Sequence, residues 1–197
     1  MKLLIATHNN KKKLELQRIL SPLGIDVVTA EDIGCELRDV EETGTTFEEN
    51  AELKAVAGCE DSGLACIADD SGLCVDYLGG EPGIYSARYS GGHGNDEKNI
   101  DKLLEKLSDV PAEQRTASFV CCACCAFPDG KIITVRGECE GEILTERHGN
   151  GGFGYDPVFK SGDKLFGEIT SVEKDKISHR GRALALMAKE LKNVITE

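Results

Sequence analysis

The sequence predicts an α/β fold built around a mixed β-sheet. Strand-like and helix-like segments alternate up to residue 107, a strand-rich block follows over 115–145, and a helix comes last. This order indicates helices packed on a sheet, with the strand-rich block forming a second lobe. Because no repeat, low-complexity segment or linker interrupts residues 1–197, we expect one domain, with a ligand cleft between its lobes.

The first part of the chain carries clear signals for the beginnings and ends of helices. The elements expected there are strands over 3–7, 25–29 and 64–68, a helix over 11–20, and a helix from Thr45–Thr46 to about residue 59. Pro22 and Gly24 end the first helix. Thr45 and Thr46 each precede a glutamate by three residues, which is a double capping-box pattern for the second helix.

The second part combines a long hairpin with two amphipathic helices. We expect strands over 115–127 and 131–145, a helix from residue 95 or 96 to 107, and a last helix over about 180–193. The sequence Pro-Asp-Gly at 128–130 is typical of the turn that joins two antiparallel strands. Apolar residues recur at helical spacing between Ile100 and Leu107, so that helix should bury one face.

The net charge of −12, from 35 acidic and 23 basic residues, argues against nucleic-acid binding. Such a field repels phosphate backbones, and a chain without tryptophan has few rings on which bases could stack. No apolar run approaches the roughly 20 residues that span a bilayer, and the apolar run that begins at Leu3 is too short for a secretory signal. We therefore expect a soluble, cytoplasmic protein with no nucleic-acid or membrane partner.

Nine cysteines, an odd number in a chain with no apparent signal peptide, indicate reduced thiols. Four of them lie in 121–125, whose C-x-x-C pattern is compatible with zinc or redox chemistry. The surrounding run 116–127 is small and apolar, which favours a buried strand with two sulfurs on each face. No second Cys or His pair follows at zinc-finger spacing, so we interpret these cysteines as core residues.

The stretch 7–13, with the sequence Thr-His-Asn-Asn-Lys-Lys-Lys, joins the first strand to the first helix. Free backbone N–H groups, the positive end of a helix and three lysines make it a candidate phosphate cradle. It lacks the glycines of a P-loop. It is equally compatible with a polar capping loop and a solvated lysine face.

Adjacent carboxylates at Asp69 and Asp70 follow the apolar strand over 64–68. Two acids leaving a buried strand are costly without a partner, and Mg²⁺ commonly binds one or two carboxylates together with substrate phosphates. Glu41 and Glu42 offer a further carboxylate. The alternative is an Asx-type turn with solvated glutamates, but we favour the metal site.

Two later stretches complete the set of candidate ligand contacts. Residues 149–157 match G-x-G-x-x-G, but Pro157 and the missing strand–turn–helix context argue against a dinucleotide-binding fold. These glycines would bring backbone close to a ligand, with Phe153 or Tyr155 as a flat face for a base, or would form a turn packed by the two rings. Residues 174–180 place basic side chains near the start of the last helix, where cations are unfavourable unless they face an anion.

Together these stretches resemble the inosine/xanthosine triphosphate pyrophosphatase family nearly from end to end. The matching motifs are Thr7-x-Asn9-x-x-Lys12, Glu41-Glu42-Thr43-Gly44, 47–51, 68–73, 79–89, 152–157 and Ser178-His179-Arg180. Agreement at so many ordered sites is improbable by chance. The resemblance implies an elongated two-lobed fold around a central mixed sheet, a homodimer, and Mg²⁺-dependent hydrolysis of XTP, ITP or dITP to the monophosphate and pyrophosphate.

The resemblance also implies roles for individual residues. Asp70 matches the catalytic acid and a metal ligand, and we predict Glu41 rather than Glu42 as the second ligand. The implied substrate contacts are Thr7, His8, Asn9, Asn10, Lys11, Lys12, Ser71, Phe153, Gly154, Tyr155, Asp156, Lys174, His179 and Arg180. His179 and Arg180 would donate hydrogen bonds to the 6-keto edge of the base, which adenine cannot accept. Lys12 and Lys174 would stabilise charge on the leaving pyrophosphate.

Two other functions fit the same residues. A pyrophosphatase for pyrimidine or methylated nucleotides would share the phosphate and metal contacts, and a substrate panel separates it from the first. A nucleotide-binding regulatory module would hold the ligand without hydrolysing it. Paired acids beside phosphates argue against such a passive binder.

Overall fold

The structure is a computed structural model that describes residues 2–92 and 94–196. Its strands are β1 (Lys2–Ile5), β2 (Asp26–Val28), β3 (Ala65–Val75), β4 (Thr116–Ala126), β5 (Ile132–Ile143), β6 (Phe159–Ser161) and β7 (Lys164–Leu165). Its helices are α1 (Asn10–Leu20), α2 (Ala30–Ile33), α3 (Phe47–Ser62), α4 (Asp96–Lys106), α5 (Ser171–Ile177) and α6 (His179–Thr196).

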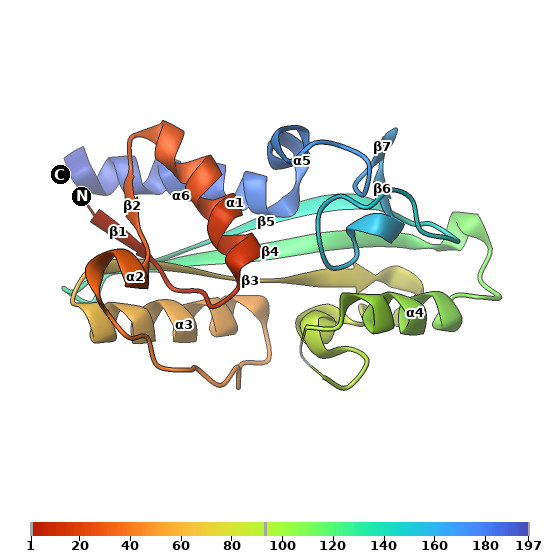
Figure 1. The fold of residues 1–197 in the computed structure, drawn as a ribbon, viewed down its shortest axis with the longest axis horizontal. Helices are drawn as coiled ribbons and strands as arrows, with labels where there is room; N and C mark the ends of the chain where they lie inside the picture. The colour runs from red at the N-terminus through yellow and green to blue at the C-terminus, as the bar shows by residue number, and fades with distance from the viewer. Residues whose placement is uncertain (1, 93, 197) are drawn as a thin grey trace. The chain divides into compact units, whose positions relative to one another are not determined.

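The strands form one mixed sheet, which confirms the predicted α/β fold (Figure 1). They are hydrogen-bonded in the order β2-β1-β3-β4-β5-β6-β7. β1 is parallel to β2 and β3, whereas β6 is antiparallel to β5 and β7. The described chain divides into two compact units, one with residues up to 70, 121–137 and from 180 onward, the other with 71–120 and 138–179. The expected cleft between lobes stays a prediction.

In the first unit, α1 and α6 cover one face of the strands and α3 covers the other (Figure 1). Leu16 of α1 and Leu184 of α6 share a core with Leu3 of β1. On the opposite face, α3 approaches the strands through Gly58, where a Cβ would come within 2.5 Å of the Cys66 sulfur. A glycine at this position therefore lets α3 lie directly on the sheet.

The second unit is built around α4 and a cluster of aromatic rings. Ile100 and Leu103 of α4 are fully buried in a core that also contains Tyr155. In the same core, the ring centroids of Phe119 and Phe159 lie 4.5 Å apart. This core anchors the glycine-rich stretch that precedes β6.

One predicted element differs from the structure. β3 does not end at residue 68 but continues through Asp69 and Asp70 to Val75, so the carboxylates do not form an Asx-type turn. Lys174 lies just before the last helix, as predicted. It belongs to a separate short helix, α5, which Thr170 and Glu173 begin with a capping box.

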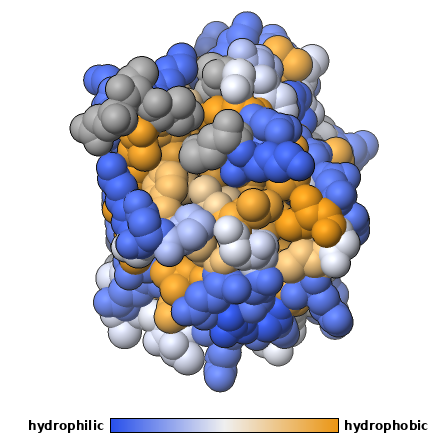
Figure 2. Space-filling model, turned by 90° about the vertical axis from the view of Figure 1, so that its left-hand side faces the viewer, coloured by the Kyte–Doolittle hydropathy of each residue, from blue (hydrophilic) through white to orange (hydrophobic). Residues whose placement is uncertain are grey.

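The surface is mixed in polarity. On the face shown in Figure 2, hydrophobic residues form a central area bordered by hydrophilic ones. Within the described ranges, no helix is apolar over a length that would cross a membrane.

The cysteines of β4 divide between the two faces of the strand, as predicted. Cys121 and Cys125 belong to the core on the α1/α6 face. Cys122 points the other way, where Arg136 Nη1 lies 3.8 Å from its sulfur, and Cys124 follows it by the two-residue alternation of a strand. All nine cysteines are free thiols.

We expect the four thiols of β4 to be unreactive in the folded protein. Burial raises the pKa of Cys124 to about 11 and that of Cys125 to about 12, and it raises the pKa values of the other two as well. Since the thiolate is both the nucleophile and the metal ligand, thiols that stay protonated near neutral pH neither alkylate nor bind zinc readily. Iodoacetamide labelling followed by mass spectrometry should modify the half-buried Cys35 before any residue of β4.

Metal analysis of protein purified without chelator gives an independent check of this prediction. Stoichiometric zinc should be missing from the preparation. One tightly bound zinc per chain, or labelling of β4 as fast as that of Cys35, would overturn the interpretation of these cysteines as core residues.

Candidate active site

Two adjacent acids on β3 face opposite sides of the strand, because successive side chains alternate. Asp69 points to the face covered by α1 and α6, and Asp70 points to the face covered by α3. Both are buried, with only 3% and 6% of their surface exposed. Each carboxylate therefore needs a partner from the helices on its own side.

Asp69 is held by cations from both covering helices. Its Oδ2 atom accepts from Arg180 Nη2 at 3.0 Å and Nε at 3.2 Å, and Lys12 Nζ lies 3.1 Å away. Arg180 Nη1 also donates to Glu15, which is itself buried. Burial alone would raise the pKa of Asp69, but Lys12, Arg180 and Lys54 hold it well below its ordinary value. These cations therefore favour the ionised form of Asp69.

Asp70 is held more loosely, by two residues one turn apart on α3. Lys54 Nζ lies 3.1 Å from Asp70 Oδ1, and Asn50 Nδ2 donates to Oδ2 at 3.3 Å. Lys54 also binds Glu42 at 2.8 Å. Burial raises the pKa of Asp70 above its ordinary value, despite the opposing effect of Lys54. A carboxyl with a raised pKa in a polar cluster is a candidate for proton transfer.

The acidic residue that the structure brings to this cluster is Glu42. The Glu41 side chain is exposed, and its backbone carbonyl accepts from Thr43. The structure thus does not place Glu41 as the sequence prediction requires, and the carboxylate that shares Lys54 with Asp70 belongs to Glu42. Adjacent glutamates in a loop cannot be distinguished by sequence pattern, since no regular alternation fixes which one points inward.

The predicted site residues did not include Lys54, Asn50 or Glu15. Asn50 and Lys54 are four residues apart on α3, so they lie on one helix face, and this spacing was a usable signal. Asn50 also accepts from the Gly44 N–H at 2.8 Å, which ties the loop that carries Glu42 to α3. Glu15 gave no such signal, because its partner Arg180 lies far away in the sequence.

The candidate phosphate loop forms the beginning of α1. The Asn9 side chain accepts from the backbone of Lys11 at 3.0 Å and of Lys12 at 3.3 Å, and Thr7 Oγ1 accepts from Asn9. The structure thus shows the capping loop of one interpretation, and the phosphate cradle stays a prediction. The side chains of His8, Asn9, Asn10 and Lys11 are exposed.

In the second unit, the glycine-rich stretch is organised by Asp156. Asp156 Oδ2 accepts from the Phe153 N–H at 2.8 Å and from Lys174 Nζ at 2.6 Å, and both side chains of the ion pair are buried. The same lysine nitrogen lies 4.8 Å from the centre of the Phe153 ring. Gly152 has a positive φ of 72°, and a Cβ there would collide with Asp156. The stretch therefore leaves the Phe153 ring half-buried, whereas Tyr155 and the Lys174–Asp156 ion pair are buried.

His179 and Arg180 are adjacent in the sequence but have different partners. The His179 ring stacks on Phe119, with centroids 4.7 Å apart. Arg180 is 1% exposed, and its guanidinium binds Asp69 and Glu15. In this geometry the Arg180 nitrogens bind the buried acids, and the expectation that Arg180 reads a base edge stays a prediction. Ser71, the residue after Asp70, is half-buried.

The carboxylates fit a hard divalent cation that also binds substrate. On the α3 face of β3, the carboxylates of Glu42 and Asp70 approach the same Lys54 nitrogen, at 2.8 and 3.1 Å. The described part of the chain contains no ready-made group of three or more ligating side chains. Mg²⁺ fits such a site, since it keeps several waters and takes one or two carboxylates plus phosphates.

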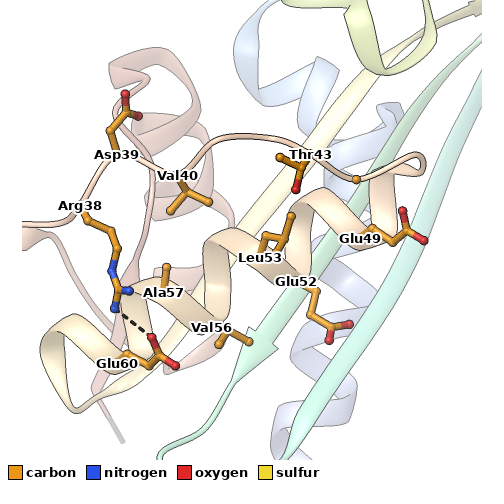
Figure 3. Close-up of a pocket in the computed structure, with 11 residues that line it drawn as sticks. Arg38, Asp39, Val40, Thr43, Glu49, Glu52, Leu53, Val56, Ala57 and Glu60 are labelled. Carbon is orange, nitrogen blue, oxygen red and sulfur yellow. Dashed lines mark hydrogen bonds and ion pairs between the residues drawn. The ribbon is translucent and has the colours of Figure 1, made fainter.

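A separate groove of about 710 Å³ lies between α3 and the loop over 38–44 (Figure 3). Val40, Leu53 and Val56 supply apolar lining, and the remaining lining includes several carboxylates. Its arginine, Arg38, already binds Glu60 and Asp61. This groove is therefore unsuited to a triphosphate.

Fold and side chains together define the class of the protein. It is an α/β protein in which an interior strand, β3, holds two buried carboxylates among lysines and an arginine. The chain belongs to the Ham1 family, whose sequence model matches residues 3–190. A protein of Bacillus subtilis named dITP/XTP pyrophosphatase is 49% identical over 190 residues, covering 95% of this chain and 96% of the relative. A protein of the same name from Mycobacteroides abscessus is 46% identical, covering 99% and 97%.

Solved structures agree with the fold. The Ham1 protein of Staphylococcus aureus is 41% identical and superposes with a TM-score of 0.85, covering 98% of this chain and 99% of the other. A HAM1 protein from Coxiella burnetii gives a TM-score of 0.86 at 36% identity, with the same coverage.

Proposed function

We propose that this protein hydrolyses dITP, XTP and ITP to the monophosphate and pyrophosphate, and so removes abnormal purine nucleotides. The observation that carries the proposal is the β3 acid pair, with Asp69 bound by Arg180 and Asp70 beside Lys54. The names of the B. subtilis and M. abscessus relatives support the same substrates. A pure binding module would gain little from two adjacent acids beside phosphates.

In the proposed mechanism, water attacks the α-phosphorus, so pyrophosphate leaves whole. Asp70 accepts the proton of this water, as its raised pKa suits a general base. Lys54 keeps Asp70 oriented through its 3.1 Å contact. Lys12, bound to Asp69, lies at the first turn of α1 and stabilises charge on the phosphates.

Glu42 and Asp70 would hold Mg²⁺ on the α3 face of β3. The ion would neutralise phosphate charge and lower the pKa of bound water. Lys54 lies between the two carboxylates and stabilises both negative charges.

Glu42→Gln should raise the Mg²⁺ concentration needed for half-maximal rate by about tenfold or more, because it removes a charged ligand. Glu41→Gln, the matched change one residue earlier, should leave this concentration unchanged. Titration of initial rate against Mg²⁺ for both variants measures the effect. The reverse result would restore Glu41 as the ligand.

Base recognition is proposed for the stretch of Phe153 and its partner Lys174. The ring offers a face for stacking. The Lys174 ammonium, which donates to Asp156 in the structure, is proposed as a donor to the 6-keto oxygen of hypoxanthine or xanthine rather than to the leaving pyrophosphate. Adenine has an amino donor at this place and would leave the lysine proton unpaired, at a cost of about 1–3 kcal/mol. His179 remains a predicted second donor.

Pyrophosphate release from a panel of nucleotides tests the proposal. dITP, ITP and XTP should be hydrolysed with kcat/KM values at least about tenfold above that of ATP. Preference for a pyrimidine or methylated nucleotide would establish the related pyrophosphatase instead. Tight binding of dITP without turnover would establish the regulatory module.

We also propose that the protein acts as a homodimer in the cytoplasm. The hydrophobic area bordered by hydrophilic residues in Figure 2 resembles the core and rim of an interface, which supports self-association. Light scattering should give the mass of two chains, and the mass of one chain would contradict the dimer.

A further inference from the structure

The stretch that carries Phe153 is held by two carboxylates from different parts of the second unit. Asp156 takes the N–H of Phe153, as described above. The next N–H along the chain, that of Gly154, donates to Asp96 Oδ2 at 2.9 Å. Asp96 is the first residue of α4 and lies 58 positions away in the sequence. Two consecutive N–H groups thus have carboxylate acceptors of independent origin.

The helix that carries Asp96 is a rigid support. Ile100 and Leu103 bury its apolar face completely, and the Asn95 side chain caps its first turn by accepting from the Lys98 N–H. The carboxylate of Asp96 is favoured at this position, since the N-terminal end of a helix is positive. A charged acceptor also makes a stronger hydrogen bond than a neutral one.

A second connection links the same stretch to α4. Tyr155 donates its hydroxyl proton to the Ser86 carbonyl at 2.9 Å, and Asn99 of α4 donates to the same carbonyl at 3.3 Å. Tyr155 is also part of the core that contains Ile100. The Tyr155 hydrogen bond fixes the end of the stretch that is buried in the core. Asp96 instead binds the backbone N–H of Gly154, the residue next to Phe153.

We infer that Asp96 is a positioning residue for base recognition, acting on Phe153 through the Gly154 backbone. Gly154 has a positive φ of 59° and no neighbouring atom that a Cβ would meet, so local packing does little to restrict it. The Asp96 carboxylate therefore supplies the restraint that keeps the backbone after Phe153 in place. This inference rests on the proposed function of the Phe153 stretch and adds a residue that does not itself touch the substrate.

The test compares three variants of the full-length protein with wild type. Asp96→Ser introduces serine, which helix N-termini favour but whose side chain is too short to reach the Gly154 N–H. Asp96→Asn keeps an oxygen acceptor of the same length. Glu97→Ser is the matched control, because Glu97 lies in the same first turn of α4 and is exposed, bound to Arg147.

Steady-state hydrolysis of dITP and dATP, followed by pyrophosphate release, gives the readout. Asp96→Ser should raise KM for dITP about tenfold and lower the dITP/dATP ratio of kcat/KM, with kcat changed by no more than about twofold. Asp96→Asn should recover most of the wild-type KM, and Glu97→Ser should match wild type.

The possible results separate the inference from the proposed function. If the wild-type protein releases no pyrophosphate from dITP, the proposed function itself is wrong. If wild type is active but Asp96→Ser and Glu97→Ser have the same KM and the same dITP/dATP ratio of kcat/KM, only the role of Asp96 is wrong. A loss of kcat and thermal stability without a change in KM would show that Asp96 supports the fold alone, and it would also overturn the inference.

Discussion

Asp70→Asn should reduce kcat for dITP by about 10³-fold at saturating Mg²⁺ while the protein remains folded. The asparagine cannot accept a proton, and general-base catalysis contributes about 10²- to 10⁴-fold to enzyme rates. The amide is close in size to the carboxyl and still fits beside Asn50 and Lys54, which contact Asp70 in the structure. Stopped or coupled assays of pyrophosphate release measure the rate.

The control for this variant is its thermal unfolding, which should resemble that of wild type. A near-normal kcat in Asp70→Asn would move the base to Asp69 or elsewhere. Asp69 is an unattractive base in this structure, because Lys12 and Arg180 hold its pKa well below the ordinary value.

Arg180→Ala should lower the free energy of unfolding by about 3–5 kcal/mol, the usual cost of breaking a buried ion pair by removing one partner. Asp69 and Glu15 would both remain buried after losing the guanidinium that binds them. Arg182→Ala is the matched control, since Arg182 lies two residues further along α6 and is exposed. Urea denaturation of both variants should show a change within about 0.5 kcal/mol for the control.

The sequence-based expectation for Arg180 leads to a different outcome. If Arg180 read the 6-keto edge, its removal would lower the ITP/ATP ratio of kcat/KM and leave stability intact. Such a result would overturn the assignment of Arg180 to the buried acid network. The structure predicts a loss of stability, and activity that falls for both nucleotides.

Local signals predicted most helices and strands because their causes lie within a few residues. Thr46 and Asn95 cap α3 and α4 as their sequence contexts indicate, and the strand alternation correctly divided the β4 cysteines. The length of β3 was not predictable in this way. Asp-Asp-Ser-Gly is typical of a turn, and only the cations from α1, α3 and α6 make it tolerable within a buried strand.

The residues of the candidate site also divide into those that neighbouring sequence predicts and those that depend on distant contacts. Motifs located Asp70 and the Phe153 stretch, since the residues that define them are adjacent in the sequence. Lys54 and Glu42 were missed or misplaced because their roles depend on how α3 and a loop without regular structure meet β3. The contacts of Arg180 with Asp69 and Glu15 could not be predicted, because these residues lie 111 and 165 positions away.

Hydrolysis of dITP in ¹⁸O-labelled water tests the central claim most directly, since the label reports which phosphorus is attacked. The β3 acid pair acting on a bound triphosphate as proposed predicts one ¹⁸O atom in dIMP and none in the released pyrophosphate, by mass spectrometry of both products. Label in pyrophosphate would place the attack on the β-phosphorus. Release of dIDP and labelled orthophosphate would contradict a pyrophosphatase altogether.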